Sequence, residues 1–384
     1  MGEELAMVTY TFNDARLADG LLRSVPTWSV RPQRVLVVDD GSATAYAPPQ
    51  MPEGAPPVAI ERLDENRGPA GAKAHGLAAV ADSDMVLSVD CDIRPAPYWV
   101  AHAKELLAEE GVGLVGGIIT CDAGSGPTAR YMARYDILDF DPQKTGFLTG
   151  NIWLMRGEVW TAVGGFGAHS GPTHEDFAFC RRLAEQGYVL RRVEDAPVRQ
   201  VRRMSRRALA AQHSRYTGAS VRAVVERKSL WDGLGPIVQL VSMRMSSAVQ
   251  RGEDVFVYLE LLLFARLMLD LFAARTRFVP QGPLDVAEFR AALMGRLEPY
   301  PTVRGLLEDD LADASPAPPG GCTGARDVWE TLLDMFTPFI RAGVFDRLER
   351  EGVATLRRED AENAFDFHYL APNADAPATD GGVK

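Results

Sequence analysis

The first 120 or so residues alternate short apolar strands with helical stretches, and this alternation restricts the fold more than any other feature of the sequence. Such a βαβ series predicts a mainly parallel sheet covered by helices, which is an α/β fold. The expected strands are Leu5–Thr11, Arg34–Val38, Val58–Arg62 and Asp84–Val89, and the expected helices are Ala15–Val25 and Gly71–Ala81. Two strands run into acidic residues, and ligands of open α/β sheets collect at the carboxyl ends of strands. We therefore expect a binding site there.

Helix dominates the rest of the chain. The strand pattern weakens from Gly113, and the stretches expected to be helical after Arg206 include Ala208–Lys228, Val255–Ala274 and Asp327–Ile340. The sequence thus predicts an α/β domain over residues 1–225, a helical domain over 226–370 and a flexible tail over 371–384.

Composition narrows the class of protein. Of 384 residues, 46% are hydrophobic and 24% charged, which is typical of a globular chain. The net charge of −11 argues against binding to nucleic acid. The four cysteines lack CxxC spacing, so neither a disulfide scaffold nor a structural zinc site is indicated, and a reducing cytoplasm fits best. Residues 1–10 do not resemble a signal peptide, so we expect a cytoplasmic protein.

One stretch, Val255–Ala274, is long enough to span a bilayer. Glu260, Arg266 and Asp270 lie within it, and each would cost roughly 2.5 to 3.5 kcal/mol near the membrane centre. We therefore predict no transmembrane segment. A buried helix of the second domain, the interface of a homodimer and peripheral contact with a membrane surface remain as alternatives.

Four groups of residues carry candidate chemistry. Asp90-Cys91-Asp92 offers hard oxygen ligands for Mg²⁺ or Mn²⁺, which could bridge the diphosphate of a nucleotide; the alternative is an ordinary strand-ending turn. Asp39-Asp40-Gly41-Ser42 is either a turn or a pair of acceptors for a base or ribose.

The third group, Asn66–Gly76, enters a helix through small residues that let a nucleotide approach the backbone, and its Lys73 offers a cation. It contains neither a P-loop nor a dinucleotide fingerprint. In the fourth group, Glu175-Asp176 precedes the expected helix Phe177–Gln186, where a carboxylate caps the helix or serves as a general base.

The order and spacing of the motifs resemble the inverting family 2 glycosyltransferases of the GT-A fold over about residues 5–225. The motifs are Thr11-Phe12-Asn13, Asp39-Asp40-Gly41-Ser42, Asn66–Gly76, Asp90-Cys91-Asp92, Thr149-Gly150-Asn151, Gly164-Gly165-Phe166 and Glu175-Asp176. The resemblance implies a nucleotide-diphospho-sugar transferase domain, followed here by the helical region.

The resemblance also implies roles for single residues. Those implied to line the nucleotide-sugar site are Thr11, Asp39, Asp40, Lys73, Asp90, Gly150 and Asn151. Asp90 and Asp92 would hold Mn²⁺ or Mg²⁺, and Asp176 would be the catalytic base beside Glu175. Two departures, Tyr10 in place of a frequent Pro and His75 in place of a frequent Asn, bear on base recognition.

A motif beyond the acid pair, Gln212-His213-Ser214-Arg215-Tyr216, permits two alignments. It partly resembles the QxxRW motif of processive members, with Tyr for Trp. In non-processive members, which we prefer, a His in this region, followed by a Ser (here Ser220), approaches the metal or diphosphate, and His213 would then be a metal ligand. The plain alternative for His213 is a polar residue on an amphipathic helix. Residues 191–228 also carry eleven Lys and Arg against three acidic residues, which indicates a solvated helix face or a cationic rim for phosphate.

These observations favour a metal-dependent inverting glycosyltransferase of the hexosyltransferase class. It would move a sugar from a nucleoside diphosphate sugar to the hydroxyl of a small molecule, a glycan or a lipid-linked acceptor. A nucleotidyltransferase of related architecture and a non-catalytic nucleotide-sugar-binding scaffold are the competing hypotheses. Release of nucleoside diphosphate rather than pyrophosphate separates the two enzymes.

Overall fold

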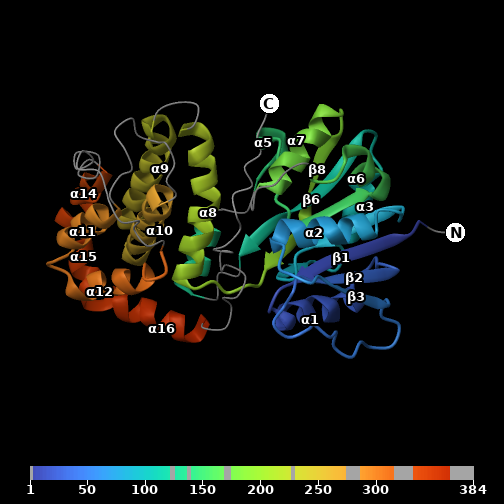
Figure 1. Cartoon of the computed structure of the whole chain (residues 1–384), viewed down its shortest axis with the longest axis horizontal. Coiled ribbons are helices and arrows are strands. Elements are labelled where there is room, and N and C mark those ends of the chain that lie inside the picture. The colour runs from blue at the N-terminus through green and yellow to red at the C-terminus, as the bar shows by residue number, and fades with distance from the viewer. Residues whose placement is uncertain are drawn as a thin grey trace.

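The structure is a computed structural model that describes residues 3–121, 126–135, 140–167, 174–225, 230–273, 286–314 and 332–363. A sheet with its covering helices occupies the right of Figure 1 and a group of helices the left. The predicted tail, 371–384, lies outside the described residues, so the structure does not bear on it.

The sheet of the described residues has eight strands in the order β3-β2-β1-β4-β7-β6-β8-β5. They are β1 (Leu5–Thr11), β2 (Arg34–Asp39), β3 (Val58–Arg62), β4 (Met85–Val89), β5 (Ile93–Pro95), β6 (Val112–Cys121), β7 (Ile152–Arg156) and β8 (Val189–Gln200). Strands β1 to β4 pair in parallel, as do β6 and β8, whereas β7 and β5 run antiparallel to their neighbours. The predicted α/β class is confirmed, and the sheet is mixed.

Helices cover both faces of this sheet because side chains alternate along each strand. The helices of this part are α1 (Ala15–Ser24), α2 (Gly68–Ala79), α3 (Trp99–Leu107), α4 (Pro127–Arg134), α5 (Pro142–Thr145), α6 (Gly157–Val163) and α7 (Glu175–Glu185). On β1, Leu5 and Met7 share a core with residues of α1 and α3. Ala6 and Val8 share the opposite core with residues of α2, α6 and α7. We call β1 to β8 with these helices the sheet region.

The sequence did not predict β5, β6, β7 or β8. In β8 the charged residues, among them Arg191, Glu194 and Asp195, hide a run of buried positions that includes Val193, Ala196 and Val198. A strand with one face in solvent shows this alternation only weakly when bulges interrupt it, and the register between β6 and β8 shifts twice.

The helical region follows β8. Its described helices are α8 (Arg206–Val225), α9 (Leu230–Gln250), α10 (Asp254–Ala273), α11 (Val286–Arg296), α12 (Pro301–Asp310), α14 (Thr337–Arg341), α15 (Val344–Arg347) and α16 (Val353–Asn363). Helix α10 is the most apolar and lies in the centre of their core, which also takes in Tyr131 and Met132 of α4. Helix α8 is the helix of this region that lies nearest the sheet in Figure 1. The division at residue 225 stays a proposal; the shared core of α8 and α10 would favour a boundary nearer Arg206.

The charged residues of α10 have partners inside the protein. Tyr131 donates a 2.6 Å hydrogen bond to Glu260, and Arg266 pairs with Asp270 at 2.6 Å and with Asp313 at 2.9 Å. Within the described ranges, none of the helices combines the length and the apolar character needed to cross a membrane.

Candidate active site

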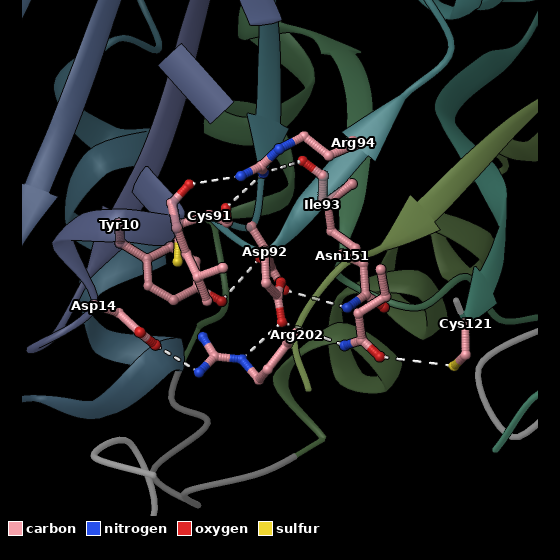
Figure 2. A network of polar contacts seen from close by, with 12 residues as sticks. Tyr10, Asp14, Cys91, Asp92, Ile93, Arg94, Cys121, Asn151 and Arg202 are labelled. Atoms are coloured by element: carbon pink, nitrogen blue, oxygen red, sulfur yellow. Dashed lines mark hydrogen bonds and ion pairs between the residues drawn. The ribbon is translucent and has the colours of Figure 1, made fainter. Parts of the chain in front are cut away.

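The acidic strand ends meet at one edge of the sheet. Strands β2, β1 and β4 are neighbours and run parallel, so their carboxyl ends bring Asp39, Thr11 and Asp90 to the same edge. Figure 2 shows this edge from close by.

Asp39 is bound on both oxygens by its own surroundings. Its carboxylate accepts backbone N–H groups of Ser42 and Tyr46, each at 3.0 Å, and pairs with Arg62 at 2.7 Å. Burial opposes the charged form, yet the hydrogen bonds from Ser42 and Tyr46 outweigh it and hold the pKa of Asp39 below its usual value. Asp39 therefore shapes the loop after β2.

Asp40 differs from its neighbour because one of its oxygens is left over. It is fully buried, and Oδ1 accepts the backbone N–H of Arg67 at 2.8 Å. Among the described residues neither Oδ2 of Asp40 nor the buried hydroxyl of Thr11 has a hydrogen-bond partner. Burial raises the pKa of Asp40 to about 6. Buried polar atoms without partners are rare, and here they suit a ligand that brings its own donors.

The side chain of Lys73 is buried, which is unusual for a lysine. Its side chain is 3% exposed, and Nζ donates to the carbonyl of Gly150 at 2.6 Å and pairs with Asp90 at 3.2 Å. The ammonium also lies 5.5 Å from the ring centre of Tyr10 and 5.6 Å from that of Trp153. Burial by itself would lower the pKa of Lys73, but the charges of Asp90, Glu175 and Asp176 raise it. Lys73 thus stands between the metal-ligand candidates and the acid pair.

Asp90 joins three elements. Its Oδ1 accepts the Tyr10 hydroxyl at 2.8 Å, and its Oδ2 accepts the Asn151 side-chain amide at 3.3 Å. Its backbone N–H also donates to the carbonyl of Asn151 at 2.8 Å. Burial raises the pKa of Asp90 to about 6, although the charge of Lys73 opposes the rise.

Asp92 is 6% exposed, and its side chain is bound by residues at the end of β8 and directly after it. Its Oδ2 accepts Nε of Arg202 at 2.9 Å and the side-chain amide of Gln200 at 3.3 Å. Figure 2 shows Arg202 reaching on to Asp14.

These carboxylates fit a magnesium or manganese ion held mainly by a substrate. Mg²⁺ is usually bound through one or two carboxylates together with waters and phosphate oxygens, rather than by an all-protein cage. In the ranges that the structure describes, no group of three or more His, Cys, Asp or Glu side chains is arranged to hold a metal ion.

His213, the third predicted ligand, lies on α8 with Thr217 at 3.4 Å from its ring. Burial, with a contribution from the charge of Arg244, lowers its pKa to about 4. Among the described residues, no hydrogen bond or ion pair joins His213 to Asp90 or Asp92, so its role as a metal ligand stays a prediction.

The acid pair begins α7. Its preceding residue, His174, has a φ of 70°, which is rare for a residue other than glycine. Asp176 accepts the backbone N–H of Phe177 at 2.8 Å on one oxygen and that of Gly150 at 3.2 Å on the other. Glu175 is buried. A side chain at Gly150 would collide with Lys73, since a Cβ there would lie 2.7 Å from its ammonium.

Two residues of this edge bind site carboxylates in contacts that the sequence did not predict. Tyr10 binds Asp90, and Arg202 binds Asp92 and Asp14. The sequence predicts Arg202 as part of a cationic rim for phosphate, but not as a partner of Asp92. Its contact with Asp92 spans more than a hundred residues of chain and needs the pairing of β5 with β8, which no local pattern shows.

The fold and this edge define a class of protein: a GT-A-type α/β domain with an acidic site at its strand ends. Residues 7–162 match the sequence profile of Glycosyl transferase family 2, and residues 85–273 match that of Glycosyl transferase family group 2. These matches support a family 2 glycosyltransferase of the GT-A fold.

Two curated proteins are similar to this chain in sequence. The chain is 31% identical over 305 residues to a pre-mycofactocin glycosyltransferase of Mycobacterium tuberculosis, a match that covers 70% of this chain and 61% of the relative. The chain thus spans about three-fifths of that relative's length. It is 28% identical over 155 residues to the succinoglycan biosynthesis protein ExoU of Rhizobium meliloti, covering 37% of this chain and 43% of the relative.

A solved structure, the mannosyltransferase PcManGT of Pyrobaculum calidifontis in complex with GDP-Man and Mn²⁺, aligns with a TM-score of 0.44. The two chains are 19% identical, and the alignment covers 82% of this chain and 87% of that one.

Proposed function

We propose that this chain is a metal-dependent inverting glycosyltransferase that moves a sugar from a nucleoside diphosphate sugar to an acceptor hydroxyl. One observation carries the proposal. The backbone of Gly150 contacts both groups of proposed site residues. Its carbonyl accepts a hydrogen bond from Lys73, which pairs with Asp90, and its N–H donates to Asp176. The proposed metal ligand and the proposed base therefore lie on either side of one loop residue.

In this mechanism Asp40 and Thr11 contact the nucleoside through their unpartnered oxygens. Asp90 and Asp92 would hold Mn²⁺ or Mg²⁺, which, when bound, neutralises charge on the departing diphosphate. Asp176 takes the proton of the acceptor hydroxyl as the acceptor oxygen bonds to the anomeric carbon. The bond from that carbon to the diphosphate oxygen breaks on the opposite face, so a single displacement inverts the anomeric configuration.

The acceptor must bring a hydroxyl to Asp176. The rest of the acceptor molecule then lies over the neighbouring aromatic residues. Phe177 is 48% and Phe140 37% exposed, and both lie against Phe147, with ring centres 5.9 and 5.1 Å away. Because exposed aromatic groups beside a site commonly bind ligands, we propose that they contact the acceptor. The name of the mycobacterial relative makes pre-mycofactocin the first acceptor to test.

A thermal-shift screen of nucleotides and nucleotide sugars with and without Mn²⁺ tests the proposal first. A ligand that binds only the native state raises the melting temperature according to its occupancy. Chromatography of reactions with the best donor then separates the hypotheses. A glycosyltransferase releases nucleoside diphosphate, a nucleotidyltransferase releases pyrophosphate, and a scaffold binds without turnover.

A further inference from the structure

Arg202 connects two carboxylates that come from different strand ends. Its Nε lies 2.9 Å from Oδ2 of Asp92, and its Nη1 lies 2.5 Å from Oδ2 of Asp14. The Arg202 side chain is 15% exposed, and those of Asp92 and Asp14 are 9% and 10% exposed. Figure 2 shows the guanidinium between the two acids. This pair of contacts is largely shielded from solvent and is screened less by salt than a surface ion pair.

The segment that carries Arg202 holds Asp92 at three successive residues. Gln200 donates its side-chain amide to Oδ2, Val201 donates its backbone N–H to the Asp92 carbonyl at 2.8 Å, and Arg202 donates Nε to Oδ2. Both side-chain contacts use the same oxygen. Among the described residues no hydrogen bond or ion pair to Oδ1 of Asp92 is found, so this oxygen is left for another partner.

At its other end, Arg202 reaches the loop after β1. In that loop the backbone N–H of Asn13 donates to the Ser42 hydroxyl at 2.9 Å, and the Asn13 side chain accepts the N–H of Ala43 at 2.8 Å. The loop after β1 is thereby tied to the loop after β2. Through Asp14 and Arg202 both are tied to Asp92 after β4.

We propose that Arg202 is a positioning residue for the donor: it fixes Asp92 by one oxygen and leaves the other to the cation bound to the diphosphate. The planar guanidinium suits this role because its fork spans two carboxylates in a fixed geometry. Its charge also offsets the repulsion between Asp14 and Asp92.

This inference rests on the proposed function, because it needs a cation-bound nucleoside diphosphate at the site. Calorimetric titration with UDP, or with GDP if the wild type does not bind UDP, tests it in the presence of Mn²⁺ and again with a chelator. The variants are Arg202→Gln, Arg202→Lys and Asp14→Asn. Arg203→Gln is the matched control, since it removes the same charge from an exposed neighbour.

With Mn²⁺, we expect Arg202→Gln to weaken binding about tenfold, the loss of roughly one charge-assisted contact. With the chelator, the same variant should bind within about twofold of the wild type. Arg202→Lys should recover part of the loss, because an ammonium keeps the charge but not the fork. Asp14→Asn should show a smaller loss, and Arg203→Gln none. A merely structural role for Arg202 would lower affinity equally with and without Mn²⁺.

Three results would overturn the inference while the proposed function survives: unchanged affinity in Arg202→Gln, an equal loss in both conditions, or tighter Mn²⁺-dependent binding, which would make Arg202 a competitor of the cation. If Arg202→Gln does not fold, Arg202→Lys and Asp14→Asn give the same comparison. A wild-type protein that binds neither nucleotide under either condition would instead overturn the proposed function, and Arg202 would lose this role with it.

Discussion

The sheet region and the helical region both bury charged side chains, but they leave them in different states. In the helical region Arg206 and Asp310 are each 1% exposed and pair at 2.9 Å. Arg206 reaches both oxygens of Asp310, and Tyr258 donates a 2.7 Å hydrogen bond to one of them. At the strand ends, by contrast, Asp40 keeps a buried oxygen without a partner in the described residues. Burial of charge alone therefore does not mark a site. Asp40 and Thr11, each of which has a side-chain oxygen without a partner among the described residues, lie together at the strand ends, where a ligand of an open sheet binds.

The largest effect that we expect tests the helical side of this comparison. Arg206→Met leaves Asp310 buried without its cation, and breaking a buried pair in this way costs about 3 to 5 kcal/mol of the free energy of unfolding. Urea denaturation measures the loss. Arg207→Met is the control, because Arg207 is 44% exposed and lies 3.7 Å from the same carboxylate; it should cost about 1 kcal/mol or less. Equal losses in the two variants would show that the buried pair has no special weight.

Asp176→Asn tests the catalytic side. Asparagine keeps an oxygen for the N–H group of Phe177 and gives up the longer hydrogen bond from Gly150, but it cannot take a proton, so transfer should fall about 10²-fold or more. Donor affinity and melting temperature should stay close to those of the wild type. Glu175→Gln should reduce transfer less. If Glu175→Gln were the more damaging, the neighbouring acid would be the base.

Asp92→Asn should remove the Mn²⁺-dependent part of nucleoside diphosphate affinity, a change of about tenfold, since an amide oxygen is a far weaker ligand for a hard cation than a carboxylate. Titrations with and without Mn²⁺ measure it. A variant that responds to Mn²⁺ as the wild type does would exclude Asp92 as a ligand.

The two regions should also differ in which property depends on pH. Burial raises the pKa of Glu260, in the helical region, from 4.5 to about 7, so the folded state holds a proton that the unfolded state has lost between these values. Stability from this group is complete below about pH 4.5 and declines as pH rises to about 7. The melting temperature of the wild type relative to Glu260→Gln should therefore fall between pH 5 and 7. Nucleotide affinity should not follow this change.

Burial raises the pKa of Asp40 to about 6, and the carboxyl group becomes a stronger acceptor for a base N–H, with no O–H of its own, as it ionises. Nucleoside diphosphate affinity, compared with that of Asp40→Asn, should rise between pH 5 and 7. A flat difference would mean that Asp40 does not contact the base.

Much of the strand-end edge follows from the sequence. The apolar runs ending in Asp39-Asp40 and in Asp90-Cys91-Asp92 are enough to predict parallel strands whose acids meet, and the topology places β2, β1 and β4 side by side. The contacts of Lys73 with Gly150 and of Arg202 with Asp92 could not be predicted, because each joins segments far apart in the chain. The charge of Glu260 excluded a membrane span, but its partner, Tyr131, comes from a different region and has no local signal.

The most direct test of the division between the regions is the rate of nucleoside diphosphate release per folded molecule in wild type, Asp176→Asn and Arg206→Met. The folded fraction is measured in the same buffer by near-ultraviolet circular dichroism. We expect Arg206→Met to lose stability but keep the wild-type rate per folded molecule, and Asp176→Asn to stay fully folded with about 1% of that rate or less. This division of roles would be contradicted by a folded Asp176→Asn protein that works at the wild-type rate, or by a folded Arg206→Met protein without turnover.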